Sequence, residues 1–199
     1  MIQVITPPAA YPVTVTEARE WARAYSDDAQ DATLAILIAA MTAHAEHITG
    51  RAFVERTLQY NCDAFRSFDL LLPPLLEVVS IKYTDSSNVE QTVAASTYEV
   101  DTTTEPGRVR AISGAAWPAV GPYFNPVRIR YKAGYRPSAS PTDLTDNSYL
   151  PAQLRLWIAA RIATLYNQRE HLIDGRDVMI ARDLADALLD PLILGGRLF

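Results

Sequence analysis

Two histidines stand close enough together to suggest metal chemistry. His44 and His47 lie three residues apart, with Glu46 between them. In the helical zinc motif of metalloproteases the two histidines lie four apart and a glutamate directly follows the first. The spacing here differs and the sequence offers no third ligand nearby. We therefore interpret the pair as a solvated helix face, with a metal site as the less favoured alternative. His171 is interpreted in the same way, as a cation at a helix end.

The usual motifs of catalysis and cofactor binding are missing from the sequence. It contains no G-x-S-x-G elbow, no P-loop and no G-x-G-x-x-G. Acidic pairs such as Asp27 and Asp28, or Asp183 and Asp186, fit helix starts and solvated faces. We therefore predict no catalytic, cofactor-binding or metal-binding residues and a protein that is not an enzyme. Hydrolysis by paired carboxylates is the enzymatic alternative.

The charge distribution argues against tight binding of nucleic acid. The 199 residues carry a formal net charge of −5. Residues 1–54 hold six acidic and three basic side chains, residues 55–136 hold nine of each, and residues 137–199 hold eight acidic and six basic. Affinity for the phosphate backbone requires a basic surface. We expect any DNA contact to be weak and non-specific.

The sequence shows no targeting or membrane signal. No run of about 18 apolar residues is present, so no membrane span is expected. The N-terminal residues lack the basic start and apolar run of a signal peptide. We expect the protein to stay in the cytoplasm that made it or to leave inside a particle. The single cysteine, Cys62, excludes an internal disulfide and is predicted to be a buried thiol.

Capping signals and apolar spacing predict two helices in the first quarter of the chain. Thr14 followed by Glu17 forms a capping box, which predicts a helix to about residue 25. Acidic residues then precede an apolar series at helical spacing that ends at Gly50, a residue suited to the left-handed C-terminal position.

A third helix is predicted after a polar loop at 136–150. Pro151 fits its first turn, and its apolar stripe contains Trp157. It should continue to about residue 170. A shorter fourth helix is expected over 178–189.

Between the second and third helices the apolar period changes to two. Strict alternation of this kind is typical of a sheet with one wet face. We predict five or six antiparallel strands over residues 55–135, separated by turns rich in Pro, Gly, Asp and Ser. The clearest alternation sets Val127, Ile129 and Tyr131 against Arg128, Arg130 and Lys132. The basic residues of this strip are interpreted as a solvated strand face or a subunit contact.

These segments together predict an α+β fold. Residues 1–54 and 137–190 should form a helical core of three to four helices. Residues 55–136 should form a small antiparallel β module, inserted between helices two and three. Residues 191–199 are expected to form a C-terminal arm.

The order of these segments resembles the head–tail connector, or adaptor, family of long-tailed phages, with relatives in prophages and gene transfer agents. The resemblance covers about residues 12–172. It is carried by the segments PVTVTEAREW, LAILIAAMTAHAEHITGRA, LLLPPLLEVVSIKYTD, YEVD, NPVRIRYKAGY and LPAQLRLWIAARIATLYNQREH.

The resemblance implies a structural protein without a cofactor, in the neck of a virion or phage-like particle. It implies a ring beneath the portal protein, and we expect this ring to be a dodecamer. Such a ring would extend the DNA channel, let DNA pass without specific binding, and support the next neck protein, a stopper or tail-completion protein. The residues expected to serve structure or subunit contact are Thr49, Gly50, Arg51, Trp157, Tyr166, Asn167, Arg169 and Glu170.

Two further readings of the sequence are kept as alternatives. One is a tail-completion or tail-terminator protein, which would contact the tail tube instead of the portal. The other is a β-rich module that binds host surface sugars. An exposed cluster of Trp117, Tyr123 and Phe124 would favour that module, whereas we expect these rings to pack beside neighbouring prolines.

The C-terminal arm is predicted to dock onto the portal. Pro191 ends the preceding helix, and Gly195 with Gly196 supplies a flexible joint. A terminus this apolar would form an exposed hydrophobic patch, prone to association, if nothing covered it. The alternative is that it folds back onto its own core. The predicted docking residues are Leu192, Ile193, Leu194, Leu198 and Phe199.

Overall fold

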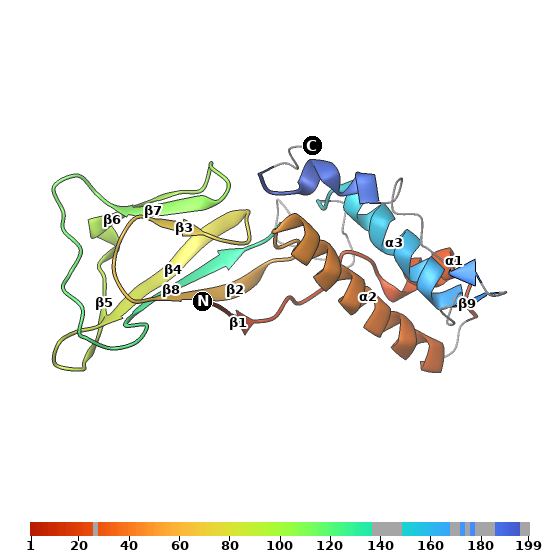
Figure 1. Ribbon diagram of the computed structural model, residues 1–199, viewed down its shortest axis with the longest axis horizontal. Helices are drawn as coiled ribbons and strands as arrows, with labels where there is room; N and C mark the ends of the chain where they lie inside the picture. The colour runs from red at the N-terminus through yellow and green to blue at the C-terminus, as the bar shows by residue number, and fades with distance from the viewer. Residues whose placement is uncertain (26–27, 137–148, 168–171, 174–175, 178–185, 196–199) are drawn as a thin grey trace. The chain divides into compact units, whose positions relative to one another are not determined.

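The chain folds into two compact units, each assembled from two separate stretches of sequence. The computed structural model describes residues 1–25, 28–136, 149–167, 172–173, 176–177 and 186–195. The β unit comprises Met1–Ala9 and Val54–Tyr135, and the helical unit comprises Ala10–Phe53 and Arg136–Phe199. The prediction of a mixed α+β fold is confirmed (Figure 1).

A five-stranded antiparallel sheet forms the larger part of the β unit. Its strand order is β1-β2-β8-β4-β5, so β8 lies between β2 and β4. The predicted alternation along β8 is confirmed, because Val127, Ile129 and Tyr131 are fully buried while the residues between them are not. The strands are β1 (Ile2–Thr6), β2 (Arg56–Cys62), β4 (Leu75–Thr84), β5 (Glu90–Thr92) and β8 (Val127–Ala133).

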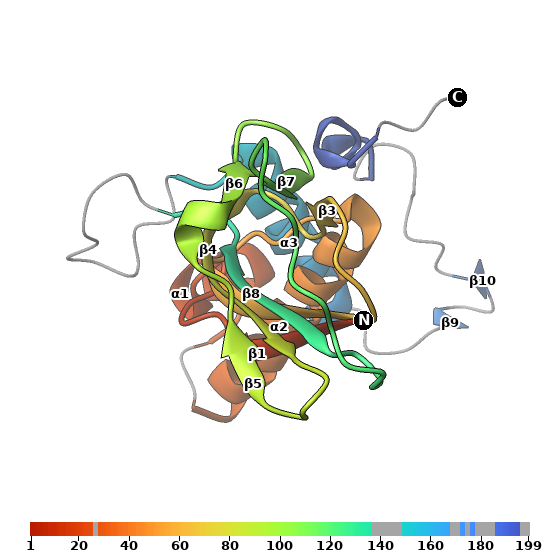
Figure 2. The ribbon, with the colours of Figure 1, turned by 90° about the vertical axis from the view of Figure 1, so that its left-hand side faces the viewer.

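A second sheet of three strands has the order β3-β7-β6 and lies on one side of the first (Figures 1 and 2). The two sheets meet closely at Gly107, where a Cβ atom would lie 2.5 Å from the Cβ of Leu75. Only glycine fits so near another side chain. Cys62 is buried in this unit, as predicted. The strands are β3 (Phe68–Leu70), β6 (Tyr98–Asp101) and β7 (Gly107–Ala111), with a 3-10 turn η1 (Ala95–Thr97) before β6.

The first strand corrects the predicted division of the chain. Residues 1–54 were assigned to the helical core, but β1 pairs antiparallel with β2, Val4 opposite Leu58. With β1 the β unit contains eight strands, and seven of them lie in residues 55–135, where five or six were predicted. A five-residue edge strand has too few alternating positions to stand out in the sequence.

In the described part of the helical unit there are three α-helices, and each contacts the other two. Arg19 on α1 makes a two-pronged ion pair with Asp31 on α2, at 2.5 and 2.6 Å. The helices are α1 (Val15–Ala22), α2 (Asp28–Thr49) and α3 (Ala152–Asn167). Two short strands, β9 (Leu172–Ile173) and β10 (Arg176–Asp177), pair with each other, and two 3-10 turns follow, η2 (Asp186–Leu188) and η3 (Asp190–Leu192).

Two helix predictions need correction. α1 ends three residues earlier than expected, because Arg23 adopts the left-handed conformation (φ 51°) and caps the helix. Of the predicted fourth helix, residues 178–185 lie outside the described residues, and its end is the 3-10 turn η2.

Trp157 on α3 lies at the centre of the helical unit. Its side chain is 1% exposed. The Arg161 guanidinium lies 5.5 Å from the centre of its ring, within the range of a cation–π contact. The ring of His44 on α2 lies 5.9 Å away. The apolar stripe of α3 is therefore covered by the other helices of its own unit.

The predicted capping box opens α1 and also ties it to α3. Glu17 Oε2 accepts a 2.8 Å hydrogen bond from the Thr14 backbone N–H, and the Thr14 hydroxyl accepts one from the Glu17 N–H. Glu17 also forms an ion pair with Arg155. Burial alone raises the pKa of Glu17, but these hydrogen bonds and the guanidinium more than offset it and hold the pKa below its usual range.

Glu17→Ala is expected to lower the free energy of unfolding by about 1–2 kcal/mol at pH 7, because it removes the cap and the bond to Arg155. A carboxyl group with a lowered pKa stabilises the fold above its unfolded-state pKa of about 4.3, and this stabilisation is lost as the pH falls through the folded-state value. The difference from wild type in urea unfolding should therefore shrink below about pH 4. Glu20→Ala, exposed on the same helix, is the control and should change stability by less than about 0.5 kcal/mol. A pH-independent difference would contradict the role given to the charge.

Candidate functional site

All three basic residues of the strip on β8 contact side chains of neighbouring strands, and two of them are paired with glutamates. Arg128 forms a 2.6 Å ion pair with Glu90 on β5, and Lys132 forms one of 2.6 Å with Glu77 on β4. Arg130 donates a hydrogen bond to the side-chain oxygen of Gln59 on β2. These contacts fit the interpretation of a solvated strand face and do not leave a bare cationic surface for DNA.

The three aromatic residues considered for sugar binding do not form one exposed cluster. Trp117 stacks on Phe65, with ring centres 4.8 Å apart and planes 6° from parallel. It also contacts Phe68 edge-on. Tyr123 is partly exposed, whereas Phe124 is 97% exposed. Trp117 therefore packs against phenylalanine rings, whereas packing beside prolines was expected, and that expectation is wrong for the exposed Phe124.

A hydrogen-bonded turn presents Phe124 to the solvent. The N–H of Asn125 donates to Asp63 Oδ1 at 2.9 Å, and the N–H of Tyr123 donates to the Gly121 carbonyl at 2.9 Å. Gly121 is fixed in turn by its N–H bond to the Thr84 carbonyl, also 2.9 Å. An exposed ring of this kind does not by itself make a sugar site.

The histidines do not come together with other metal ligands in the part of the chain that the structure describes. No three side chains of the His, Cys, Asp and Glu types lie close enough there to hold an ion. His44 lies beside the Trp157 ring, and His47 is exposed on the last turns of α2.

The motif residues at the end of α2 hold the C-terminal segment of the chain. Arg51 Nε donates a 2.6 Å hydrogen bond to the Leu192 carbonyl. The Thr49 carbonyl accepts a 2.9 Å hydrogen bond from the Leu194 N–H. Gly50 is left-handed (φ 70°), and the place of its missing Cβ lies 3.7 Å from Leu194 Cβ. These three residues therefore serve the internal structure of the helical unit.

The motif residues of α3 also make bonds within the helical unit. The Tyr166 hydroxyl donates a 2.5 Å hydrogen bond to Gln30 Oε1 on α2, and Asn167 Nδ2 donates one of 2.9 Å to the Ala163 carbonyl. Trp157 is buried and so unavailable as a direct subunit contact. Arg169 and Glu170 lie outside the described residues.

Part of the predicted docking arm is folded against its own unit. Leu189 is fully buried, and Leu192, Ile193 and Leu194 are half-buried. For these residues the structure has the arrangement of the fold-back alternative. Leu198 and Phe199 lie outside the described residues. Docking of the arm onto a portal stays a prediction, and its free portion can begin no earlier than Gly195.

The outward face of α2 is apolar and uncharged. No Asp, Glu, Lys or Arg occurs between Ala32 and Ala45, although a solvent-facing stripe of a helix usually carries charge. Ile36 is 70% exposed on this face. We define the α2 face as the exposed residues Ala32, Ile36, Ala40 and Ala43, which follow one another at helical spacing.

By length and composition, Gln30–Thr49 is also the one described helix that could cross a membrane, contrary to the expectation from sequence. The core helix of a soluble protein can have the same length and composition. Only 28% of this apolar stretch is buried. A large part of this apolar helix is thus left uncovered by the helical unit.

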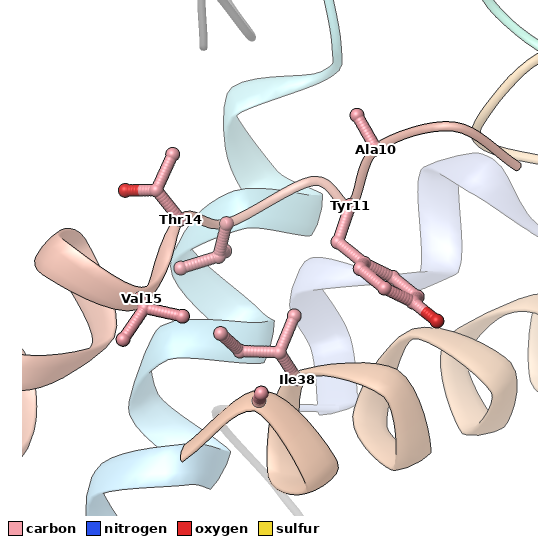
Figure 3. A pocket seen from close by; sticks show the side chains of 7 residues that line it. Ala10, Tyr11, Thr14, Val15 and Ile38 are labelled. Carbon is pink, nitrogen blue, oxygen red and sulfur yellow. The ribbon is translucent and has the colours of Figure 1, made fainter. Parts of the chain in front are cut away.

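A small apolar pocket borders the α2 face. It has a volume of about 180 Å³ and lies between the segment before α1 and the middle of α2 (Figure 3). Val13, Val15 and Ile38 line it, and Tyr11 stands at its side. Exposed Ala35 belongs to both the pocket and the flank of the α2 face. The space suits an apolar side chain better than a polar ligand.

Comparison with known proteins finds likeness at the level of solved structures. No family model and no curated protein matches the chain. The chain is similar to one in the neck of an empty gene transfer agent particle computed with C6 symmetry, with a TM-score of 0.76 and 24% identity. It is similar to one in the virion of a native gene transfer agent particle (0.74 and 25%) and to one in the neck of a native particle computed with C12 symmetry (0.69 and 26%). Each match covers 99% of both chains.

Proposed function

We propose that this protein is a structural component of the neck of a phage-like particle, where it forms a ring beneath the portal and joins the head to the tail. The observation that carries the proposal is the likeness over 99% of both chains to proteins from gene transfer agent necks and virions.

The symmetry of those necks supports a ring of many copies. Assemblies with C6 or C12 symmetry place identical chains around one axis, and a head-to-tail contact with a closing rotation produces such a ring. Twelve copies would match a dodecameric portal above the ring. The next neck protein, a stopper or tail-completion protein, would bind its other side.

The charge of the chain suits a channel for DNA. Its net charge is −5, and two of the three basic residues of the strip on β8, Arg128 and Lys132, are paired with glutamates. A surface without free cationic patches lets the phosphate backbone slide past without being held. We therefore propose passage of DNA without specific binding and a role that is mechanical, with the particle assembled in the host cytoplasm.

A tail-completion protein is the second candidate, and location separates the two. The experiment is to label the chain, image purified particles by electron microscopy and count copies by quantitative mass spectrometry. We expect label at the junction between head and tail and about twelve copies per particle. One or two copies, or label along the tail beyond the neck, would contradict the proposal.

A further inference from the structure

In a head-to-tail ring each subunit has two different contact surfaces, one for each of its two neighbours. This inference rests on the proposed function, since only a ring requires both. Subunit-contact residues were expected on α3, but its Trp157 is buried. Trp157 therefore does not supply the ring contact, and the exposed apolar surfaces of the chain are candidates for it.

The α2 face has the properties of a surface onto which a neighbouring subunit could pack. Its alanines allow a neighbour to approach the helix backbone closely, and Ile36 adds exposed apolar area. The pocket beside it offers about 180 Å³, enough for one aromatic ring. No charged side chain on α2 from Ala32 to Ala45 would have to be stripped of water on contact.

A complementary surface lies at the end of α1 in the same helical unit. Trp21, in the last turn of α1, is 49% exposed, and Tyr25, just beyond the cap, is 83% exposed. Large aromatic residues are the side chains that most often dominate protein interfaces. The two exposed aromatic residues complement the α2 face, because both surfaces are apolar and the pocket beside the face can hold one ring.

We propose that Trp21 and Tyr25 of one copy pack onto the α2 face of the next copy, and that this contact closes the ring. The occupant of the α2 face is thus a second copy of the same chain. Because the two contacting surfaces differ, each copy packs its two aromatic residues onto one neighbour and its α2 face against the other neighbour. The contact repeats around the axis without a free end.

Disulfide cross-linking in particles tests this contact directly. A full-length chain carrying both Tyr25→Cys and Ala40→Cys is assembled into particles and oxidised. On a non-reducing denaturing gel we expect a ladder of dimers, trimers and larger species. Each single variant is the matched control and should give no ladder, since buried Cys62 offers no partner.

A charge placed on the α2 face provides an independent measurement. Ala40→Glu should reduce incorporation into necks on the order of tenfold or more, because it buries an unpaired carboxylate at every contact. Ala95→Glu, at an exposed alanine of the β unit, should have no effect. Circular dichroism and urea unfolding confirm that both variants fold.

The outcomes separate this inference from the proposed function. A full complement of copies in the neck, with no ladder and normal incorporation of Ala40→Glu, would overturn the assigned contact and leave the ring intact. Absence of the protein from the neck would overturn both. Binding of the purified chain to phosphatidylglycerol vesicles that Ala40→Glu abolishes, again with no ladder, would assign the α2 face to a membrane instead.

Discussion

If the proposed function holds, particles in which this protein lacks residues 196–199 are expected to accumulate as heads without tails. This truncation removes Leu198 and Phe199, the anchors predicted to reach the portal. It keeps the hydrogen bonds that join Leu192 and Leu194 to the end of α2. Burial of one such side chain is worth about 1.5–3 kcal/mol before ordering costs, and the anchors repeat around a ring. Tailed particles should therefore fall by about a hundredfold or more.

The measurement is a count of tailed and tailless particles by electron microscopy, with unfolding of the purified chain followed in urea. A longer truncation, without residues 191–199, should abolish tail attachment as well and also lower stability, since it removes the bonds of the folded-back segment. Tailed particles at the normal frequency after the short truncation would show that the arm does not dock. A short truncation that unfolds the subunit would assign the end of the chain to the core.

Trp157→Ala should produce the largest loss of stability of any single change considered. The side chain is 1% exposed, and its ring lies under the Arg161 guanidinium and beside His44. Removal of a buried tryptophan leaves a cavity and typically costs about 3–5 kcal/mol. That is a large part of the 5–15 kcal/mol by which most domains are stable.

Urea unfolding followed by circular dichroism checks this value. Trp157→Phe keeps most of the apolar volume and should cost clearly less than the alanine variant. A loss below about 1 kcal/mol for Trp157→Ala would mean that the helical unit does not depend on this residue. Such a result would also restore Trp157 as a candidate for contact with another subunit.

Local signals in the sequence predicted much of the fold. The capping box of Thr14 and Glu17 and the alternation along β8 depend on residues close together in the chain, and both are confirmed. Their periodicity follows directly from helix and strand geometry. The α+β class followed from the same patterns.

What the sequence did not reveal depends on distant partners. β1 becomes a strand by pairing with β2 more than 50 residues later. The 189–194 segment is held by Arg51, 141 residues from its partner Leu192. The α2 face was also missed, because which side of an apolar helix is left uncovered depends on how its neighbours pack. Its signal was present in the uncharged run from Ala32 to Ala45.

Because each unit is divided between two stretches of sequence, helices that pack together are synthesised at different times. α2 ends at Thr49 and α3 begins at Ala152, so about a hundred residues are synthesised between them. At roughly 5–20 residues per second, a ribosome needs about 5–20 s to add that length. During this interval both sides of α2 are uncovered: the one that α3 will bury and the one left for a neighbour. The nascent chain therefore carries the apolar helix α2 for several seconds before its partner helix α3 is made.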